Sequence, residues 1–569
     1  MGSFTVSLNL IYREEIMGGV QSTSRQHEPS VRISKELSEG EKCARRKRNN
    51  VVRHAILKLT GKCPDKGREP TIAVLGSGGG LRATIAMLGT LQALADSDLL
   101  DCVSYLSGVS GSTWAMSQLY SQMEWSVNME QMVSDLRSQI TEKKRTCHDS
   151  MEYLKQIGND PTYSLTHFWG ASLVYDCLGK IETSKLSDHQ VAASNGTNPY
   201  PIYAAVHGHR ERHSHTTDAW FEFTPHEVGF PTPGAFVSTK EFNHKFDAGT
   251  KIKEMNVEKD LNYLQGLWGS ALADKKAIWE WIKEQLWRIV HQPQLLSSSP
   301  ESEQSHCEHC SRKLMEILEI LNEGENFEAA LSKLNLDETE LCGLSDHQNR
   351  SSEYYCEKLI GNLETVNEAE NKNTQVDEKR CLIPSVYMKT MRALVSWNWG
   401  ENPNFAYHDS RIKELSPRGL ELYEQEYLYL IDAGLENNCA YPLVLREERK
   451  VDLVLSFDFS AGDPFLTLTE AGKYCTANGI PFPDLPLELD KTPHDFYVFT
   501  KPGAPTVVHF PLFNDCNCTD GSSPKTMMDK FGTQKLSYTG YEFDELLGAA
   551  SQNVSKNVGK ITEQIEALL

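Results

Sequence analysis

Two glycine-rich segments of the chain carry residue types suited to acyl transfer. Residues 71–88 read TIAVLGSGGGLRATIAML, and residues 105–114 read YLSGVSGSTW. Within the second segment, residues 108–112 are close to the G-x-S-x-G pattern, with the second glycine one place early. At a strand-to-helix turn this pattern exposes the serine, here Ser110, as a nucleophile. Backbone N–H groups of the first segment could then stabilise the oxyanion that forms on an attacked carbonyl.

A serine nucleophile needs a base, and the sequence offers two arrangements. Asp432 ends the apolar run LYLID and precedes an Ala-Gly turn, so a buried carboxylate there could accept the proton directly. A conventional triad would instead use a late histidine, with His494 and His509 as candidates. His509 lies in the strand-like run TVVHFPLFN, a position typical of a structural histidine. The residue chemistry alone leaves both arrangements open.

The glycine loop also has to be compared with phosphate-binding loops. A Walker A loop requires a lysine, whereas this loop offers Arg82 at a different spacing. Residues 78–83 formally match the Rossmann pattern, but that fold needs an acidic residue at the end of the next strand. Asp98 and Asp101 precede that strand, which ends in glycine and serine. We therefore favour an oxyanion over a nucleotide as the ligand of the loop.

These residues must be positioned by a parallel α/β arrangement. Residues 51–125 alternate helical and strand-like segments, and strand patterns return after residue 425 in YLYLIDAG and VDLVLSFDFSAGDPF. The sequence predicts one discontinuous catalytic domain over residues 46–540, preceded by a flexible extension over residues 1–45. An acidic, partly disordered insertion is expected at residues 297–379, and a C-terminal helix at residues 541–569.

Composition narrows the classes of partner. The 57 Lys and Arg residues against 78 Asp and Glu residues give a net charge of −21, which argues against nucleic-acid binding. The exception is residues 43–59, CARRKRNNVVRHAILKL, which could contact a membrane surface. We favour a solvated helix face whose apolar side packs in the core.

The cysteines and termini point to a cytoplasmic protein. The 14 cysteines are scattered, and the CEHC at residues 307–310 has no second ligand pair, so no metal site is predicted. We find no secretory signal and no apolar run approaching the roughly 20 residues that span a bilayer. The N-terminal glycine lacks the Ser or Thr of a myristoylation motif, and the C-terminus has no cysteine for prenylation.

Several ordered motifs resemble the catalytic domain of the cytosolic phospholipase A2 family. They include VLGSGGGLRA, YLSGVSGSTW, YSLTHFWG, WFEFTPHEVGF, GLWGSALAD, LSFDFSAGDPF and VHFPLFN. Their order and spacing are most similar to the short gamma type, and they cover roughly residues 65–290 and 380–520. The resemblance implies a three-layer α/β acyl-hydrolase core with a mixed, mostly parallel sheet and a helical cap or lid.

The resemblance also assigns roles to single residues. It places the nucleophile on Ser110 and the carboxylate base on Asp432, which favours the dyad. The oxyanion-hole glycines fall on Gly79 and Gly80. The arginines that hold the substrate phosphate fall on two further positions, Arg82 and Arg449.

The function implied is that of a calcium-independent phospholipase A2 or lysophospholipase that works through an acyl-enzyme and can transacylate an alcohol acceptor. Calcium independence is expected because the residues before the core lack an acidic calcium-ligand pattern. No cofactor is expected, and the expected partners are glycerophospholipids and, transiently, intracellular membrane surfaces. The alternatives are a triad esterase or lipase acting on neutral lipids and a non-catalytic lipid-binding homologue.

Overall fold

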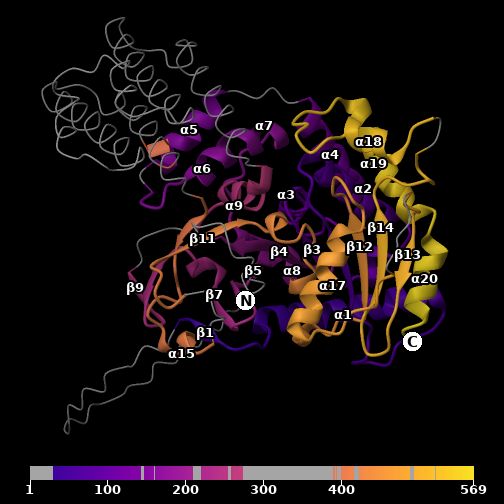
Figure 1. The fold of residues 1–569 in the computed structure, drawn as a ribbon, viewed down its shortest axis with the longest axis horizontal. Helices are drawn as coiled ribbons and strands as arrows, with labels where there is room; N and C mark the ends of the chain where they lie inside the picture. Colours follow the sequence, from indigo (N-terminus) through magenta and orange to yellow (C-terminus); the bar gives the residue numbers. More distant parts are fainter. Residues whose placement is uncertain are drawn as a thin grey trace, which may run out of the picture.

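The computed structural model describes residues 30–142, 147–158, 160–208, 220–253, 258–272, 389–390, 393, 399–415, 422–486, 492–518 and 521–569. A sheet of 12 strands crosses the molecule, with helices on both sides (Figure 1). Its strands are β1 Arg32–Ile33, β2 Ile72–Gly76, β3 Tyr105–Gly108, β4 Tyr200–His207, β5 Trp220–Phe223, β6 Glu227–Phe230, β7 Ala235–Ser238, β10 Glu401–Pro403, β11 Tyr427–Asp432, β12 Leu453–Asp458, β13 Tyr497–Phe499 and β14 Thr506–Pro511. A separate hairpin is formed by β8 Lys245–Asp247 and β9 Thr250–Lys253.

The helices fall between and after these strands. They are α1 Glu39–Thr60, α2 Leu81–Asp96, α3 Gly111–Leu119, α4 Met129–Thr141, α5 Cys147–Ile157, α6 Leu165–Trp169, α7 Tyr175–Leu178, α8 Gln190–Ser194, α9 Leu261–Trp268, α15 Ser410–Lys413, α16 Tyr441–Val444, α17 Leu466–Asn478, α18 Pro524–Lys530, α19 Gly540–Ser555 and α20 Val558–Glu566. None of the helices within the described ranges is long and apolar enough to cross a bilayer.

The centre of the sheet is parallel and its flanks are antiparallel. Strands run in the order β1-β7-β6-β5-β4-β3-β2-β12-β14-β13, and β4, β3, β2, β12 and β14 pair in parallel. β5, β6, β7 and β1 extend one flank with antiparallel pairs, and β13 closes the other. The predicted α/β class is confirmed, and its parallel character belongs to the central strands.

Alternating residues of the central strands enter two separate hydrophobic cores. In β2, Ile72 and Val74 join the core under α2 and α19, whereas Ala73 and Leu75 join the core under α16 and α17. This period of two is expected where a strand is covered on both faces. Helix, sheet and helix therefore form the three predicted layers.

Helix α1 corrects the predicted N-terminal boundary. The extension was expected to reach residue 45, but β1 pairs with β7, and α1 begins at Glu39 with Ser38 as its N-cap. A side chain such as Glu41, fully buried in this segment, shows that the chain already belongs to the core there. The boundary was misplaced because polar residues in this helix are paired inside the protein rather than solvated.

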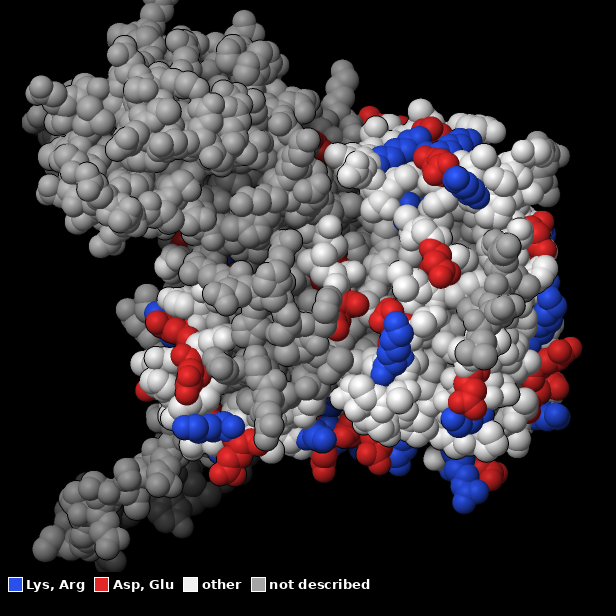
Figure 2. Space-filling view, viewed as in Figure 1, with Lys and Arg blue, Asp and Glu red and all other residues white. Residues whose placement is uncertain are grey.

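The basic stretch of α1 also differs from the prediction. Arg48 is buried and donates to the carbonyls of Leu100 and Val103, and Arg45 donates to the Tyr105 hydroxyl. Arg46 remains exposed. The inward face is thus not only apolar: its arginines bind carbonyls and a hydroxyl around the start of β3. On the face seen in Figure 2, basic and acidic side chains are interspersed.

The C-terminal segment forms two helices instead of the one predicted. α19 and α20 are separated near Lys556, and α19 packs so closely on α2 that a Cβ on Gly89 would lie 2.4 Å from the Leu547 carbonyl oxygen. The Ser551 hydroxyl donates to the Gly89 carbonyl at 2.9 Å. These helices therefore complete the core instead of following it. The predicted insertion at residues 297–379, including Cys307 and Cys310, lies outside the described residues.

Candidate active site

Strand topology brings Ser110 and Asp432 together from positions far apart in the sequence. β3 pairs with residues 200–203 of β4 in parallel, and β11 pairs with residues 205–207 of the same strand in the antiparallel direction. Because β5 occupies the other edge of β4, β3 and β11 lie on one edge and run toward each other. Their carboxyl ends therefore meet end to end, with Ser110 following one and Asp432 closing the other.

Ser110 occupies a strained turn between β3 and α3. Its φ of 52° and ψ of −125° lie in a region that side chains rarely adopt. The turn is tight, since a Cβ on Gly111 would lie 1.9 Å from the Gly80 carbonyl oxygen, and a Cβ on Gly78 would lie 2.7 Å from the Ser110 Cβ. Small residues are therefore required on both sides of the serine. This is the geometry that the sequence pattern predicted.

Asp432 is buried and held by backbone donors. The Gly434 N–H donates to its Oδ1 at 2.8 Å, and the Ala271 N–H donates to its Oδ2 at 3.2 Å. The Ser110 side chain lies close enough to the same carboxylate to act on its pKa. Burial raises the pKa of Asp432 to about 7, although these hydrogen bonds act in the opposite direction. The carboxyl group can therefore both release and accept a proton near neutral pH.

The glycine loop presents free donors beside the serine. β2 and β3 are parallel neighbours with Gly76 opposite Gly108, so the two turns lie side by side as predicted. Neither the Gly79 nor the Gly80 N–H donates to any acceptor in the described ranges. Gly80 has a φ of 61° and stands at the N-cap of α2. The N-termini of α2 and α3, each with a partial positive charge, thus both lie beside Gly80 and Ser110.

Two residues that support this geometry were not found from the sequence. Asn438 clamps the loop, because its carbonyl accepts the Gly78 N–H at 3.1 Å and its side-chain amide donates to the Gly78 carbonyl at 3.1 Å. The Ser270 hydroxyl accepts the Asp432 N–H at 3.0 Å. Ser270 lies in the motif GLWGSALAD, and Asn438 follows shortly after Asp432 in the chain. No other feature of the sequence pointed to a role for either residue. Nothing in a lone Asn or Ser indicates which backbone group it will meet.

Arg82 lies beside the oxyanion loop. A Cβ on Gly79 would approach its Nη2 to 2.7 Å. Its guanidinium donates to the carbonyls of Phe459 and Phe531 and to the Thr533 hydroxyl, all neutral acceptors. Burial lowers the pKa of Arg82 to about 10, so the group stays cationic at neutral pH. Three of its five N–H donors are used, and its charge has no carboxylate hydrogen-bonded to it among the described residues.

Arg449 does not join this site, which corrects the role predicted for it. Its Nε and Nη2 donate to Glu41 at 2.9 and 3.1 Å, and its Nη1 and Nη2 donate to Glu222 at 2.8 and 3.2 Å. The fifth donor reaches the Leu443 carbonyl at 2.6 Å. Its guanidinium lies over the ring of Tyr105, at the start of β3, whereas Ser110 follows the end of that strand. No donor is left for a phosphate.

The two triad histidines lie elsewhere as well. His509 is buried in β14, and its Nε2 lies 2.7 Å from the Pro464 carbonyl oxygen. His494 is exposed, and its Nδ1 lies 2.5 Å from Asp515. In the part of the chain that the structure describes, no hydrogen bond joins either of them to Ser110 or Asp432, so neither candidate histidine serves as the base of a triad. Among the residues that the structure describes, no group of three or more His, Cys, Asp or Glu side chains is arranged to hold a metal ion.

Known proteins resemble this chain in sequence and in fold. Residues 72–276 match the lysophospholipase catalytic domain model. The chain is 35% identical to cytosolic phospholipase A2 gamma of Mus musculus, covering 92% of this chain and 89% of that one. It is also 35% identical to the Homo sapiens protein of that name, covering 94% and 96%. The solved structure of human GIVD cytosolic phospholipase A2 has the same fold, with a TM-score of 0.67, 22% identity, and coverage of 95% of this chain and 69% of that chain. The protein therefore belongs to the cytosolic phospholipase A2 family.

Proposed function

We propose that this chain hydrolyses fatty-acyl esters of glycerophospholipids, as a phospholipase A2 and lysophospholipase, through a Ser110–Asp432 dyad. The observation that carries the proposal is that β3 and β11 bring Ser110 to a buried carboxylate whose pKa is raised to about 7. A carboxylate of ordinary acidity would be a poor base at neutral pH, whereas this one is matched to the task. The family membership supplies the class of ester.

The reaction proceeds in two steps. Asp432 takes the proton of the Ser110 hydroxyl as its oxygen attacks the ester carbonyl, and the N–H groups of Gly79 and Gly80 bind the resulting oxyanion. Collapse of this intermediate breaks the ester bond, and the departing lysophospholipid oxygen receives the proton from Asp432. Water, deprotonated by Asp432, then attacks the acyl-enzyme and releases the fatty acid. An alcohol in place of water gives transacylation.

Arg82 is the group proposed to bind the phosphate of the substrate. Its charge is not neutralised by a hydrogen-bonded carboxylate, it retains unused N–H donors, and it adjoins the oxyanion loop. A phosphate bound there would fix which ester meets Ser110. Each catalytic role is thus filled by a protein group, and we propose that the reaction does not require calcium. Contact with intracellular membranes is proposed to be peripheral and transient, at the cytoplasmic side.

The test is product analysis with the full chain, using phosphatidylcholine vesicles labelled differently in the two acyl chains and lysophosphatidylcholine, each with a calcium chelator. Ser110→Ala should abolish fatty-acid release and leave the fold intact. The matched control is Ser117→Ala, at a buried serine of α3 whose hydroxyl donates to the Trp114 carbonyl and accepts from the Gln265 side chain. Retained hydrolysis in Ser110→Ala would overturn the nucleophile, and loss of wild-type activity on chelation would overturn calcium independence.

A further inference from the structure

We infer that Glu41 of helix α1 is a positioning residue for the active site, acting through Arg449 on the segment that follows Asp432. This inference rests on the proposed function only for the identity of the nucleophile, Ser110. It assigns the N-terminal helix, which lies before the matched catalytic-domain region, a part in holding the oxyanion loop in place.

The first link is the pairing of Arg449 with two carboxylates from distant parts of the chain. Glu41 comes from α1 and Glu222 from β5, and the side chains of all three residues are at most 1% exposed. Glu41 binds the guanidinium through both of its oxygens. Glu41 also accepts the Tyr105 hydroxyl at 2.8 Å. A buried arginine held in this way has a single orientation, because any other leaves donors and charges unpaired.

The second link runs from Arg449 to the oxyanion loop. Arg449 donates to the carbonyl of Leu443, in the short helix α16. α16 begins three residues after Asn438, which binds Gly78 of the loop through two hydrogen bonds. α16 has only four residues, too few to hold its own position by helix cooperativity. Arg449 therefore fixes the position of α16, at the end of this segment. The same segment begins with Asp432 and contains Asn438, which holds the oxyanion loop.

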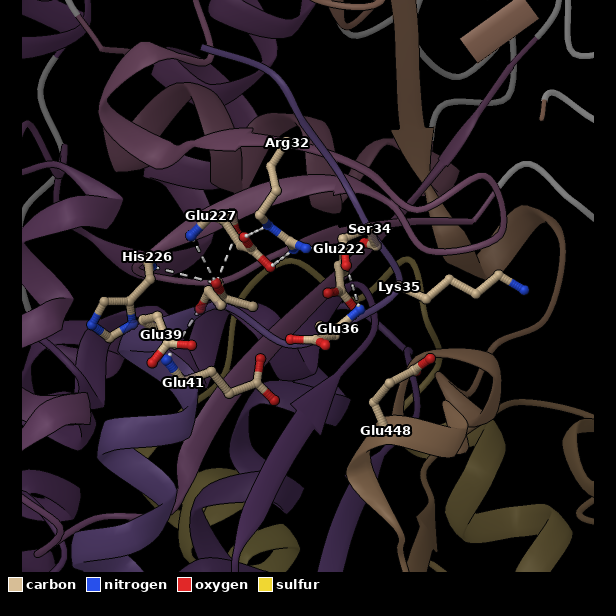
Figure 3. Close-up of polar contacts among 12 residues, drawn as sticks. Arg32, Ser34, Lys35, Glu36, Glu39, Glu41, Glu222, His226, Glu227 and Glu448 are labelled. Carbon is tan, nitrogen blue, oxygen red and sulfur yellow. Dashed lines mark hydrogen bonds and ion pairs between the residues drawn. The ribbon is translucent and has the colours of Figure 1, made fainter. Parts of the chain in front are cut away.

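The same N-terminal segment offers a matched comparison. Arg32 forms a bidentate ion pair with Glu227 of β6, at 2.6 and 3.0 Å (Figure 3). Figure 3 shows this pair in the same cluster as Glu41 and Glu222. Glu227, like Glu41, is a buried glutamate that binds an arginine, but the hydrogen bonds of its side chain do not reach Arg449 or α16. Loss of either pair loosens the N-terminal segment, and only one of them leads to the active site.

The experiment compares Glu41→Gln with Glu227→Gln in the full chain. The readout is the second-order rate constant for labelling of Ser110 by an alkyl fluorophosphonate, at a temperature where circular dichroism shows each variant fully folded. This rate reports the geometry of the serine and oxyanion loop for any natural substrate. We expect Glu41→Gln to lower it about tenfold, as small misplacements of reacting groups do, and Glu227→Gln to change it less than about twofold.

Vesicle hydrolysis supplies a second readout, in which Glu41→Gln should lower kcat with KM little changed. Glu41→Asp serves where Glu41→Gln does not fold, since it keeps the charge but shortens the reach to Arg449, and a severalfold slower labelling is expected. Equal labelling rates in the folded Glu41 and Glu227 variants would overturn the inference. Normal labelling of wild type without phospholipid hydrolysis would overturn the proposed substrate and leave the positioning test intact.

Discussion

Two buried arginines, Arg82 and Arg449, show opposite ways of using the same side chain. Arg449 has every donor matched and two carboxylates beside it, at the amino end of β3. Arg82 hydrogen-bonds only neutral acceptors among the described residues, and it lies beside the loop at the carboxyl ends of β2 and β3. An arginine whose donors are all used by carboxylates and a carbonyl is a structural anchor, whereas one with unused donors and no hydrogen-bonded carboxylate can still bind an anionic ligand.

The contrast extends from the arginines to their surroundings. The active-site edge also keeps a serine at positive φ, a carboxyl with a raised pKa and glycine N–H groups without acceptors. Each of these features costs folding free energy, roughly 1–3 kcal/mol for a strained residue. The anchor at the other end of β3 pairs its groups fully. Stability arguments therefore distinguish Arg82, which we propose to bind phosphate, from the structural Arg449.

The largest expected effect is on stability, from Arg449→Gln. The substitution leaves Glu41 buried without its ion-pair partner, while Glu222 keeps its pair with Arg446, and breaking a buried pair costs about 3–5 kcal/mol. Chemical denaturation should show this loss in the free energy of unfolding. As a control, Arg137→Gln removes an exposed pair with Asp544 and should cost less than about 1 kcal/mol. A small effect of Arg449→Gln would contradict its role as an anchor.

Arg82→Gln should act on the substrate instead of the fold. Loss of a charge-assisted hydrogen bond to phosphate is expected to lower kcat/KM for phosphatidylcholine about 10- to 100-fold. Hydrolysis of a long-chain ester without phosphate should fall far less, because the acyl chain and the carbonyl still meet the same groups. Parallel assays on the two esters measure the difference. An equal loss on both would make Arg82 a structural residue like Arg449.

The pH dependence tests the raised pKa of Asp432. The base must be ionised, and its pKa of about 7 means that the active fraction grows as pH rises toward 7. kcat/KM should therefore fall about tenfold for each pH unit below this pKa and level off above it. The profile should be measured at constant ionic strength on wild type, with folding checked at each pH. An inflection near pH 4 would mean that burial does not raise the pKa.

The smallest effect comes from comparing Ser110→Gly with Ser110→Ala. Both variants lack the hydroxyl, but glycine adopts the observed φ of 52° without strain and alanine does not. Ser110→Gly should consequently be more stable than Ser110→Ala by about 1 kcal/mol in thermal or chemical unfolding. Equal stabilities would indicate that the turn relaxes when the hydroxyl is removed.

Much of the active-site edge could be predicted from local patterns. The strand-turn-helix pattern around Ser110 and the strand end at Asp432 depend on neighbouring residues, so both elements form where the sequence indicates. Gly79 and Gly80 were placed correctly beside the serine turn, because parallel neighbouring strands end at the same edge. Asn438 and Ser270 were missed, because each acts by meeting one backbone group from a remote segment.

The anchor could not be predicted from spacing. Arg449 lies 408 positions after Glu41 and 227 positions after Glu222 in the chain. The alignment of Arg449 with a family motif suggested that it binds phosphate. Its acidic partners could not be recognised, because they lie so far away in the sequence. For the same reason the N-terminal extension was drawn too long, since residues paired in the interior resemble solvated ones in the sequence.

The amino-acid sequence by itself determined the turns, the strand ends and the identity of the groups able to do chemistry, because these depend on backbone preferences over a few residues. Only the tertiary structure decided which of those groups remain unpaired. Whether a charge or an N–H group is satisfied depends on what distant segments bring to it, as β11 brings Asp432 to Ser110 and α1 brings Glu41 to Arg449.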